Sequence, residues 1–218
     1  MKTMHRRYVR SAVAVVWSVL FIFLFMQGIL FAQSVVDEWQ AVKTPPPPEL
    51  KAVTIDPSTT ALLLLDFNKQ TCNVKTRPRC ISSIPAVANL LKKVRDNGAK
   101  VIYSLSAGAT VADIAQELMP AAYEPVVTSG PDKFLGTDLE KIIKEKGIKT
   151  VIVTGTAAHG AVIYTASGAA LRGIKVVVPV DGISADNTYA EQYTVWHLMN
   201  APRVSNQVTL TKTTSINF

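Results

Sequence analysis

The 218-residue chain lacks the motifs by which many proteins hold a nucleotide or a metal. It contains no G-x-G-x-x-G sequence and no P-loop, so no glycine-rich loop is available to bind a nucleotide cofactor. It has only two cysteines, and no second Cys or His pair lies near them to complete a zinc site. We therefore expect no cofactor and no metal.

A basic surface typical of nucleic-acid binding is also missing. Four of the 23 basic residues lie in the first ten positions, and the remaining 19 nearly balance 16 acidic residues. These lysines and arginines do not form a stripe interleaved with aromatic residues. Such a small excess of positive charge gives no reason to expect an acidic partner, so we expect the protein not to bind nucleic acid.

One long segment near the start has no charge at all. Residues 1–10 contain four basic side chains, and the segment from Ser11 to Ala32 is uncharged. This order is typical of a secretory signal peptide, and "LFA" before Gln33 is an acceptable cleavage site. The segment is also long enough, at about 20 residues, to span a bilayer as an uncleaved anchor. In both cases we expect a periplasmic or otherwise extracytoplasmic domain that meets the membrane only through residues 1–32.

The two cysteines, Cys72 and Cys80, lie eight positions apart in the polar segment "TCNVKTRPRC". In an oxidising compartment such a pair in a loop is most simply a disulfide. Closing so short a loop would stabilise the fold by roughly 2–3 kcal/mol. Two free thiols remain the alternative.

Beyond a proline-rich linker, residues 33–59, the hydrophobic pattern becomes regular. Continuous apolar runs, which indicate buried strands, alternate with segments of helical pattern. The expected strands are residues 60–67, 99–106, 149–155 and 175–181, and the expected helices are 84–98, 137–148, 164–174 and 188–202, followed by a short final segment at 207–213. This alternation predicts a single α/β domain, residues 60–218, with a parallel sheet covered by helices on both faces.

Two stretches of the sequence carry a family resemblance: "ALLLLDFNKQTC" and "GTDLEKIIKEKGIKTVIVTGTAAHGAVIYTASGAALRGIKVVVPVDG". In their order and spacing they resemble the isochorismatase-like superfamily, which includes isochorismatases, nicotinamidases and other cysteine hydrolases. Members open with a strand that ends in an aspartate, carry a lysine before a G-T-x-L helix start, and place a catalytic cysteine after a T-G turn. The resemblance implies a Rossmann-like three-layer fold, hydrolysis of a small molecule, and possible self-association into a homo-oligomer.

Asp66 matches the aspartate that serves as general acid or base in this family. A carboxylate at the end of a buried apolar run is partly desolvated, which suits a group that transfers a proton. The alternative is an aspartate that only caps the next turn.

The family's nucleophile position is occupied by Ala161, because "TGTAAHGAV" aligns with T-G-x-x-x-x-x-C. A methyl group cannot attack a carbonyl carbon, so the usual acyl-enzyme route is excluded unless another residue substitutes. True isochorismatases also lack this cysteine and carry an A-H pair in the turn, which Ala158 and His159 resemble. They cleave an enol ether by acid chemistry led by the aspartate, so the resemblance is compatible with a site that works without a thiol.

The family's lysine would fall near Thr128 or Ser129, but the lysine present is Lys133, several residues later. A shifted loop would bring Lys133 to Asp66, where its ammonium would act on the carboxylate or on a substrate oxygen. The alternative is a solvated loop lysine. Ser106 occupies the position of the glutamine used by isochorismatases, and the metal ligands of nicotinamidases are absent, so neither substrate is supported.

The turn after the third predicted strand is expected to bind an anion or a carbonyl oxygen. Its small residues allow the backbone to approach a ligand closely, although they also suit tight helix packing. The resemblance further implies a cis peptide between Thr156 and Ala157. The substrate-binding residues that we predict are Gly155, Thr156, Ala157, His159 and Ala161.

Three polar side chains have simpler explanations. His159 would either donate a hydrogen bond to a ligand or fix the turn structurally. His197, on an amphipathic helix, is expected to pack between elements or lie at an interface. Asp181 ends a later strand and is expected to cap a turn.

The sequence leaves two functions open. The first is an exported hydrolase that uses Asp66 and Lys133 on a small anionic or carbonyl compound. The second is a catalytically silent relative that binds a small ligand or a partner protein in the periplasm.

Overall fold

The computed structural model describes residues 34–218, so the predicted signal or anchor segment lies outside the described residues. Within residues 34–218, no helix is both long and apolar enough to cross a membrane. The chain divides into two compact units, Met1–Pro45 and Pro46–Phe218. The first contains the short helix α2 (Val35–Glu38), capped by Ser34. The second contains the expected domain and also residues 46–59 of the expected linker.

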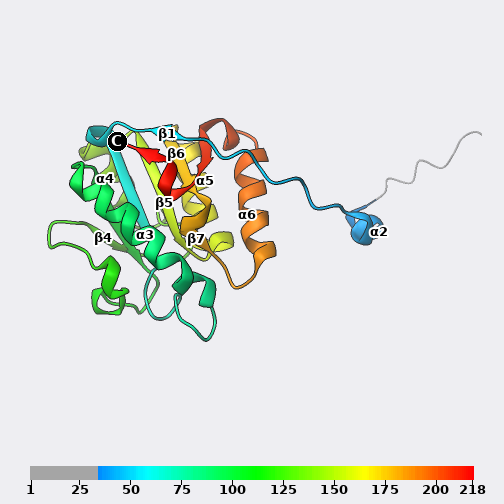
Figure 1. Cartoon of the computed structure of the whole chain (residues 1–218), viewed down its shortest axis with the longest axis horizontal. Coiled ribbons are helices and arrows are strands. Elements are labelled where there is room, and N and C mark those ends of the chain that lie inside the picture. The colour runs from blue at the N-terminus through cyan, green and yellow to red at the C-terminus, as the bar shows by residue number, and fades with distance from the viewer. Residues whose placement is uncertain (1–33) are drawn as a thin grey trace, which may run out of the picture. The chain divides into compact units, whose positions relative to one another are not determined.

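The second unit is built on a seven-stranded parallel sheet, drawn in Figure 1. Its strand order is β4-β3-β2-β5-β6-β8, with the short β7 beside β5. The strands are β2 (Thr60–Leu65), β3 (Lys100–Leu105), β4 (Val126–Thr128), β5 (Thr150–Thr156), β6 (Lys175–Pro179), β7 (Ile183–Ser184) and β8 (Val208–Thr211). The predicted α/β class is confirmed. Between β2 and β5 the direction in which strands are added reverses, and such a switch point is where open α/β sheets bind ligands.

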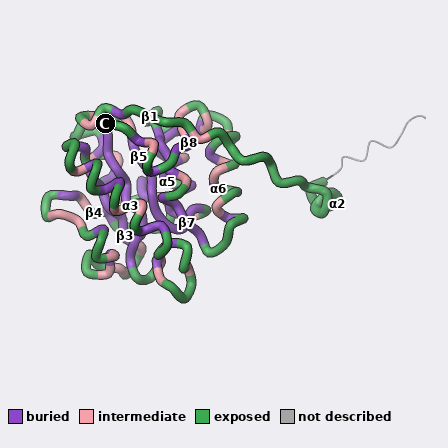
Figure 2. The backbone as a smooth tube through the Cα atoms, in the orientation of Figure 1, coloured by how far each residue is buried: buried purple, intermediate pink, exposed green. Residues whose placement is uncertain are grey.

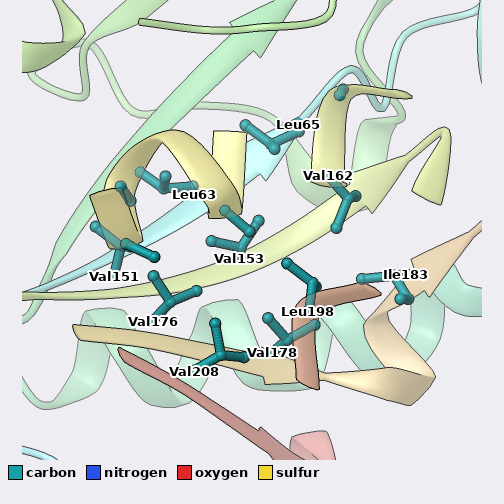
Figure 3. Close-up of a cluster of buried hydrophobic side chains, with 14 of the residues drawn as sticks. Leu63, Leu65, Val151, Val153, Val162, Val176, Val178, Ile183, Leu198 and Val208 are labelled. Carbon is teal, nitrogen blue, oxygen red and sulfur yellow. The ribbon is translucent and has the colours of Figure 1, made fainter. Parts of the chain in front are cut away.

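Helices cover the two faces of the sheet. Helix α3 (Pro78–Asp96) packs on one face, while α4 (Leu139–Glu145), α5 (Ile163–Leu171) and α6 (Thr188–Asn200) pack on the other. Because successive strand residues point to opposite faces, Leu62 and Leu64 belong to the α3 side and Leu63 and Leu65 to the α5 side. Figure 2 shows the strands buried between these layers, and Figure 3 shows the cluster on the α5 side.

A two-stranded parallel sheet joins the beginning and the end of the second unit. It pairs β1 (Val53–Thr54) with β9 (Ile216–Asn217), and the backbone N–H of Lys51 donates to Leu210 O at 2.9 Å. These short strands, like β4 and β7, are too brief to give a recognisable hydrophobic period.

Helix α3 begins earlier than expected. The predicted helix started at residue 84, but α3 starts at Pro78, where a proline is well tolerated because the first N–H groups of a helix have no intrahelical partner. Pro85 lies inside the helix at an exposed position. Cys80 consequently lies in the first turn of α3 and not in a loop.

The predicted disulfide is present. Cys72 and Cys80 are bonded, with their Cα atoms 5.4 Å apart. Both side chains are buried, and the bond ties the segment after β2 to the first turn of α3. The chain has no other cysteine, so it has no free thiol.

Candidate active site

The ends of β2 and β5 bring the predicted site together at the switch point of the sheet. Asp66 directly follows Leu65, the last residue of β2. Leu65 is paired in register with Gly155, the penultimate residue of β5. The aspartate and the turn after β5 therefore lie at the same edge of the sheet, as the sequence predicts.

Asp66 has a left-handed backbone conformation, with φ at 56°. Among non-glycine residues Asp and Asn adopt this conformation most readily. The backbone around it is held on both sides: its N–H donates to Ser104 O at 3.2 Å, and its carbonyl accepts a hydrogen bond from Thr71 Oγ1. Its side chain is almost completely buried. The positive φ turns the chain away from the strand direction where β2 ends, so the regular alternation of side chains between the two sheet faces stops at Asp66.

Lys133 lies beside Asp66. Its Nζ is 2.8 Å from Asp66 Oδ2, and its side chain has an exposed fraction of 0%. The same Nζ donates to Ser129 O at 3.3 Å. The interpretation of Lys133 as a solvated loop residue is therefore wrong, and the displaced lysine still reaches the aspartate.

The loop between β4 and α4 is packed on α5, and this packing explains how Lys133 reaches the site. The N–H of Lys133 donates to Thr165 Oγ1 at 3.3 Å. The next residue, Phe134, packs on Gly168, where an added Cβ would lie 3.1 Å from the ring. The guanidinium of Arg172 covers the same ring at 4.3 Å from its centroid.

Ser104, near the end of β3, is a site residue that sequence reasoning missed. Its Oγ donates to Asp66 Oδ1 at 2.7 Å, so the two carboxylate oxygens have different partners. The available signal was a serine that interrupts the apolar run "VIYSL" on a strand next to β2.

A second polar group links the ends of β2 and β3. The Asn68 side chain is completely buried, and its Nδ2 donates to Ser106 Oγ at 2.9 Å and to Gln70 Oε1 at 2.8 Å. The N–H of Ser106 donates in return to Asn68 Oδ1 at 3.3 Å. Ser106 therefore helps to hold the segment after β2 against β3.

The turn after β5 requires a glycine at its start. Gly155 has φ at 143°, and a Cβ there would lie 2.4 Å from Leu65 O. The Thr156–Ala157 peptide is cis, as the resemblance implies. A turn of π-helical hydrogen bonding, Ala158–Val162, then leads into α5.

The nucleophile position and the turn histidine have different surroundings. Ala161 is 4% exposed and belongs to the hydrophobic cluster on the α5 side. His159 is exposed, and its Nε2 lies 4.0 Å from Asp186 Oδ1. The backbone holds the turn itself, since the N–H groups of Gly160 and Val162 both donate to Ala157 O.

Two other predicted side chains lie in structural roles. Asp181 accepts hydrogen bonds of 2.8 Å from both the N–H and the Oγ1 of Thr213, so it caps a turn as expected. His197 lies between α5 and α6, with Nε2 at 3.3 Å from Ser167 Oγ and its ring 6.1 Å from that of Tyr193. In the part of the chain that the structure describes, no group of three or more His, Cys, Asp or Glu side chains is arranged to hold a metal.

The domain combines a parallel α/β sheet with a buried carboxylate and ammonium at the switch point. This combination is typical of enzymes that bind small molecules. Residues 60–213 match the model of the isochorismatase domain family, and the chain belongs to that family. The secreted isochorismatase effector of Verticillium dahliae is 32% identical over 47% of this chain. The match spans 60% of the effector's length, which is less than two thirds of that protein.

Solved structures confirm the fold. An isochorismatase family protein from Desulfovibrio vulgaris superposes with a TM-score of 0.66 at 21% identity, covering 72% of this chain and 96% of its own. N-carbamoylsarcosine amidase from Thermoplasma acidophilum gives a TM-score of 0.60 at 21% identity, covering 71% of this chain and 96% of its own. At these identities the likeness concerns the fold alone.

Proposed function

We propose that the protein is an exported isochorismatase-like hydrolase that uses Asp66 for acid–base chemistry on a small anionic or carbonyl compound, without a cysteine nucleophile. The observation that carries the proposal is the buried pair of Asp66 and Lys133 at the switch point. Removing two charges from water is expensive, and apolar residues of similar size often serve stability better. A buried pair at a ligand-binding edge is therefore a good candidate for chemistry.

The chemistry follows from what the chain offers and what it lacks. Both cysteines form the disulfide and Ala161 presents a methyl group, so no thiol is available to form an acyl-enzyme. An enol ether does not need one. Asp66 gives its proton to the terminal carbon of the double bond, water adds to the resulting oxocarbenium carbon, and the hemiketal collapses into an alcohol and a ketone. The proton released from water returns to Asp66, and the ammonium of Lys133 stabilises the carboxylate formed in between.

We assign the turn Gly155–Ala161 to substrate binding in this proposal. It follows β5 directly beside Asp66, and Gly155, Ala157 and Ala161 present little side-chain bulk. His159 lies at the exposed end of this turn, where a hydrogen bond to a polar group of the substrate is available to it.

We also place the protein outside the cytoplasm. A disulfide persists in oxidising compartments, and the Cys72–Cys80 bond fits such a location. The Verticillium dahliae relative is named as a secreted effector. The basic and uncharged segments of residues 1–32 supply the sequence argument.

The proposal is tested with two small molecules that separate the possible reactions. Isochorismate is an enol ether, and N-carbamoylsarcosine is an amide-type substrate whose hydrolysis suits a thiol nucleophile. Although Ser106 replaces the glutamine of isochorismatases, isochorismate serves as a model enol ether, and we expect the purified full-length chain to cleave it in preference to N-carbamoylsarcosine. Asp66→Asn should lower turnover by a factor of about 10² to 10⁴, because the amide cannot supply the proton. Asparagine also tolerates the left-handed backbone, so the fold should be kept.

Undiminished turnover by Asp66→Asn would refute the acid–base role. A matched control is Glu124→Gln, since Glu124 is also a buried carboxylate paired with a cation but lies in another part of the fold. This control should keep turnover within about twofold, as expected for a group outside the reacting centre.

A catalytically silent ligand-binding protein is the second candidate, favoured by the buried methyl group of Ala161. It predicts no turnover of either compound, together with binding that raises the melting temperature. Binding without turnover would therefore support this candidate over the hydrolase.

A further inference from the structure

We propose that Ser104 is a positioning residue that holds the exchangeable proton of Asp66 on one particular oxygen, Oδ1. The inference rests on the role of Asp66 under the proposed function and adds to it the oxygen atom that carries the proton. It draws on a contact between two neighbouring strands, β2 and β3.

The two carboxylate oxygens of Asp66 are not equivalent. Oδ2 lies 2.8 Å from Lys133 Nζ, an ammonium that only donates hydrogen bonds. A proton on Oδ2 would face this cation. Oδ1 lies 2.7 Å from Ser104 Oγ, whose hydroxyl both donates and accepts. The proton of the neutral acid is therefore held between Asp66 Oδ1 and Ser104 Oγ.

The Ser104 hydroxyl fits both protonation states of the acid. When Asp66 is ionised, the hydroxyl donates to Oδ1; when Asp66 is neutral, the hydroxyl rotates and its oxygen accepts a hydrogen bond from the protonated Oδ1. Ser104 is 2% exposed and Asp66 5%, so bulk water offers little competition for this hydrogen bond. An alanine at this position would leave Oδ1 without its partner, and the buried charged form would lose most from that change.

The contacts around Asp66 show which neighbours reach its carboxylate and which hold only its backbone. Among residues 34–218, the polar contacts to its carboxylate oxygens come from Ser104 and Lys133. Thr71 bonds only the backbone carbonyl of Asp66, and Ser129 bonds only Lys133. Ser104 also holds the Asp66 backbone, since its carbonyl accepts the Asp66 N–H at 3.2 Å. A substitution that keeps the backbone of Ser104 removes only the side-chain hydrogen bond.

The test is a titration of the Asp66 carboxyl carbon by NMR in the full-length chain labelled at aspartate, with Asp66→Asn used for assignment. Ser104→Ala should raise the titration midpoint, because the hydrogen bond that it removes favours the ionised form. Ser104→Thr restores a hydroxyl and should return the midpoint close to that of the native chain.

Ser83→Ala is the matched control. It removes another buried serine hydroxyl, one that donates to Cys80 O at 2.8 Å on α3 and does not touch Asp66. The midpoint should not move in this variant. An unchanged midpoint in Ser104→Ala, or an equal shift in Ser83→Ala, would overturn the proposal. If Ser104→Ala does not fold, Ser104→Cys places a weaker donor in the same position and should give a smaller upward shift; no shift would count against the proposal.

The titration needs no substrate, so its failure is distinguishable from failure of the proposed function. If Asp66→Asn keeps full turnover while the midpoint shifts as described, the proton position stands and the catalytic role falls. If turnover depends on Asp66 but Ser104→Ala leaves the midpoint unchanged, the catalytic role of Asp66 stands and the proposed proton position falls. Where isochorismate is cleaved, the same upward shift should be seen in the pH profile of kcat/KM.

Discussion

Two carboxylates of this domain are buried beside a cation, and their partners differ. Arg95 holds Glu124 with both arms of its guanidinium, Nε to Oε1 at 2.9 Å and Nη2 to Oε2 at 2.7 Å, and the N–H of Ala121 adds a third hydrogen bond. Asp66 has one ammonium and one hydroxyl. The guanidinium and the backbone N–H that hold Glu124 can only donate, although the Tyr103 hydroxyl also lies beside this carboxylate; one oxygen of Asp66, by contrast, is held by a hydroxyl alone.

The neighbours of Arg95 explain the first arrangement. Arg95 also donates to the Tyr103 hydroxyl and to Met119 O, which joins α3 to the loop before β4. Burial raises the pKa of Tyr103 above its ordinary value, so this hydroxyl stays neutral. Glu124 and Arg95 thus clamp the loop before β4 to α3. Burial of a charge by itself therefore does not mark a functional site.

Among variants that compare the two buried pairs, Lys133→Met is expected to lower the free energy of unfolding most. The substitution leaves Asp66 buried without a cation, and breaking such a pair typically costs about 3–5 kcal/mol of unfolding free energy. Arg95→Met should cost less, because 31% of the Arg95 side chain is exposed and water can replace part of it. Chemical denaturation followed by circular dichroism measures both.

A double mutant separates charge from packing. Asp66→Asn combined with Lys133→Met should be more stable than Lys133→Met alone, because the uncompensated charge is gone. A double mutant no more stable than the single one would show that Lys133 contributes by packing and not through its charge.

A smaller effect is expected from Gly168→Ala, which acts on Lys133 through Phe134. Alanine usually stabilises a helix interior by about 0.5–1 kcal/mol relative to glycine. Here its Cβ would lie 3.1 Å from the Phe134 ring, which is buried and covered by Arg172. We expect a net loss of about 1 kcal/mol, as in other overpacked sites, and reduced turnover. Thermal and chemical unfolding give the stability change.

The control for this change is Gly130→Ala in the loop that carries Lys133. A Cβ at Gly130 would meet no atom within 4 Å, and its φ lies outside the left-handed region. This variant should be neutral or slightly more stable, by up to about 1 kcal/mol. A stabilised Gly168→Ala would contradict the tight packing of Phe134 on α5.

The smallest effect is expected from a partly exposed carboxylate, Glu140, in the same part of the fold. Hydrogen bonds from Lys144 and then from Arg172 lower its pKa from 4.5 to about 2. Because the folded-state pKa is the lower one, the stabilisation is fully present above about pH 4.5 and is lost as the pH falls toward 2. The difference in melting temperature between the native chain and Glu140→Gln should follow this window and shrink at about 1 M salt. A constant difference down to pH 2 would contradict it.

The sequence predicted the features that depend on hydrophobic period and spacing. The strand β2, the Asp66 that follows it and the glycine turn at the end of β5 follow from continuous apolar runs and from the position of Gly155. The disulfide follows from two cysteines in one segment. These features are local, so a single stretch of sequence contains the physical information that determines them.

The remaining features depend on contacts between distant segments. Lys133 reaches Asp66 because Phe134 packs on Gly168, and a sequence does not show which loop will lie on α5. Ser104 became a site residue only when β3 was placed in register with β2. The start of α3 at Pro78 was missed because its first turn, which carries the disulfide, lies in a polar segment without an apolar helical period.

The backbone of Asp66 has a consequence for evolution within the family. At φ of 56° most side chains would add strain, and glycine, asparagine and aspartate are the residues that fit best. In a lineage that had lost its activity, the backbone would therefore still restrict this position to a few residue types. An aspartate at this position is for that reason weak evidence that a relative is an active enzyme. Lys133 is under no such conformational restriction, and an idle buried ammonium would readily be exchanged for an apolar side chain. In comparing relatives, we therefore expect loss of the lysine, more than loss of the aspartate, to accompany loss of activity.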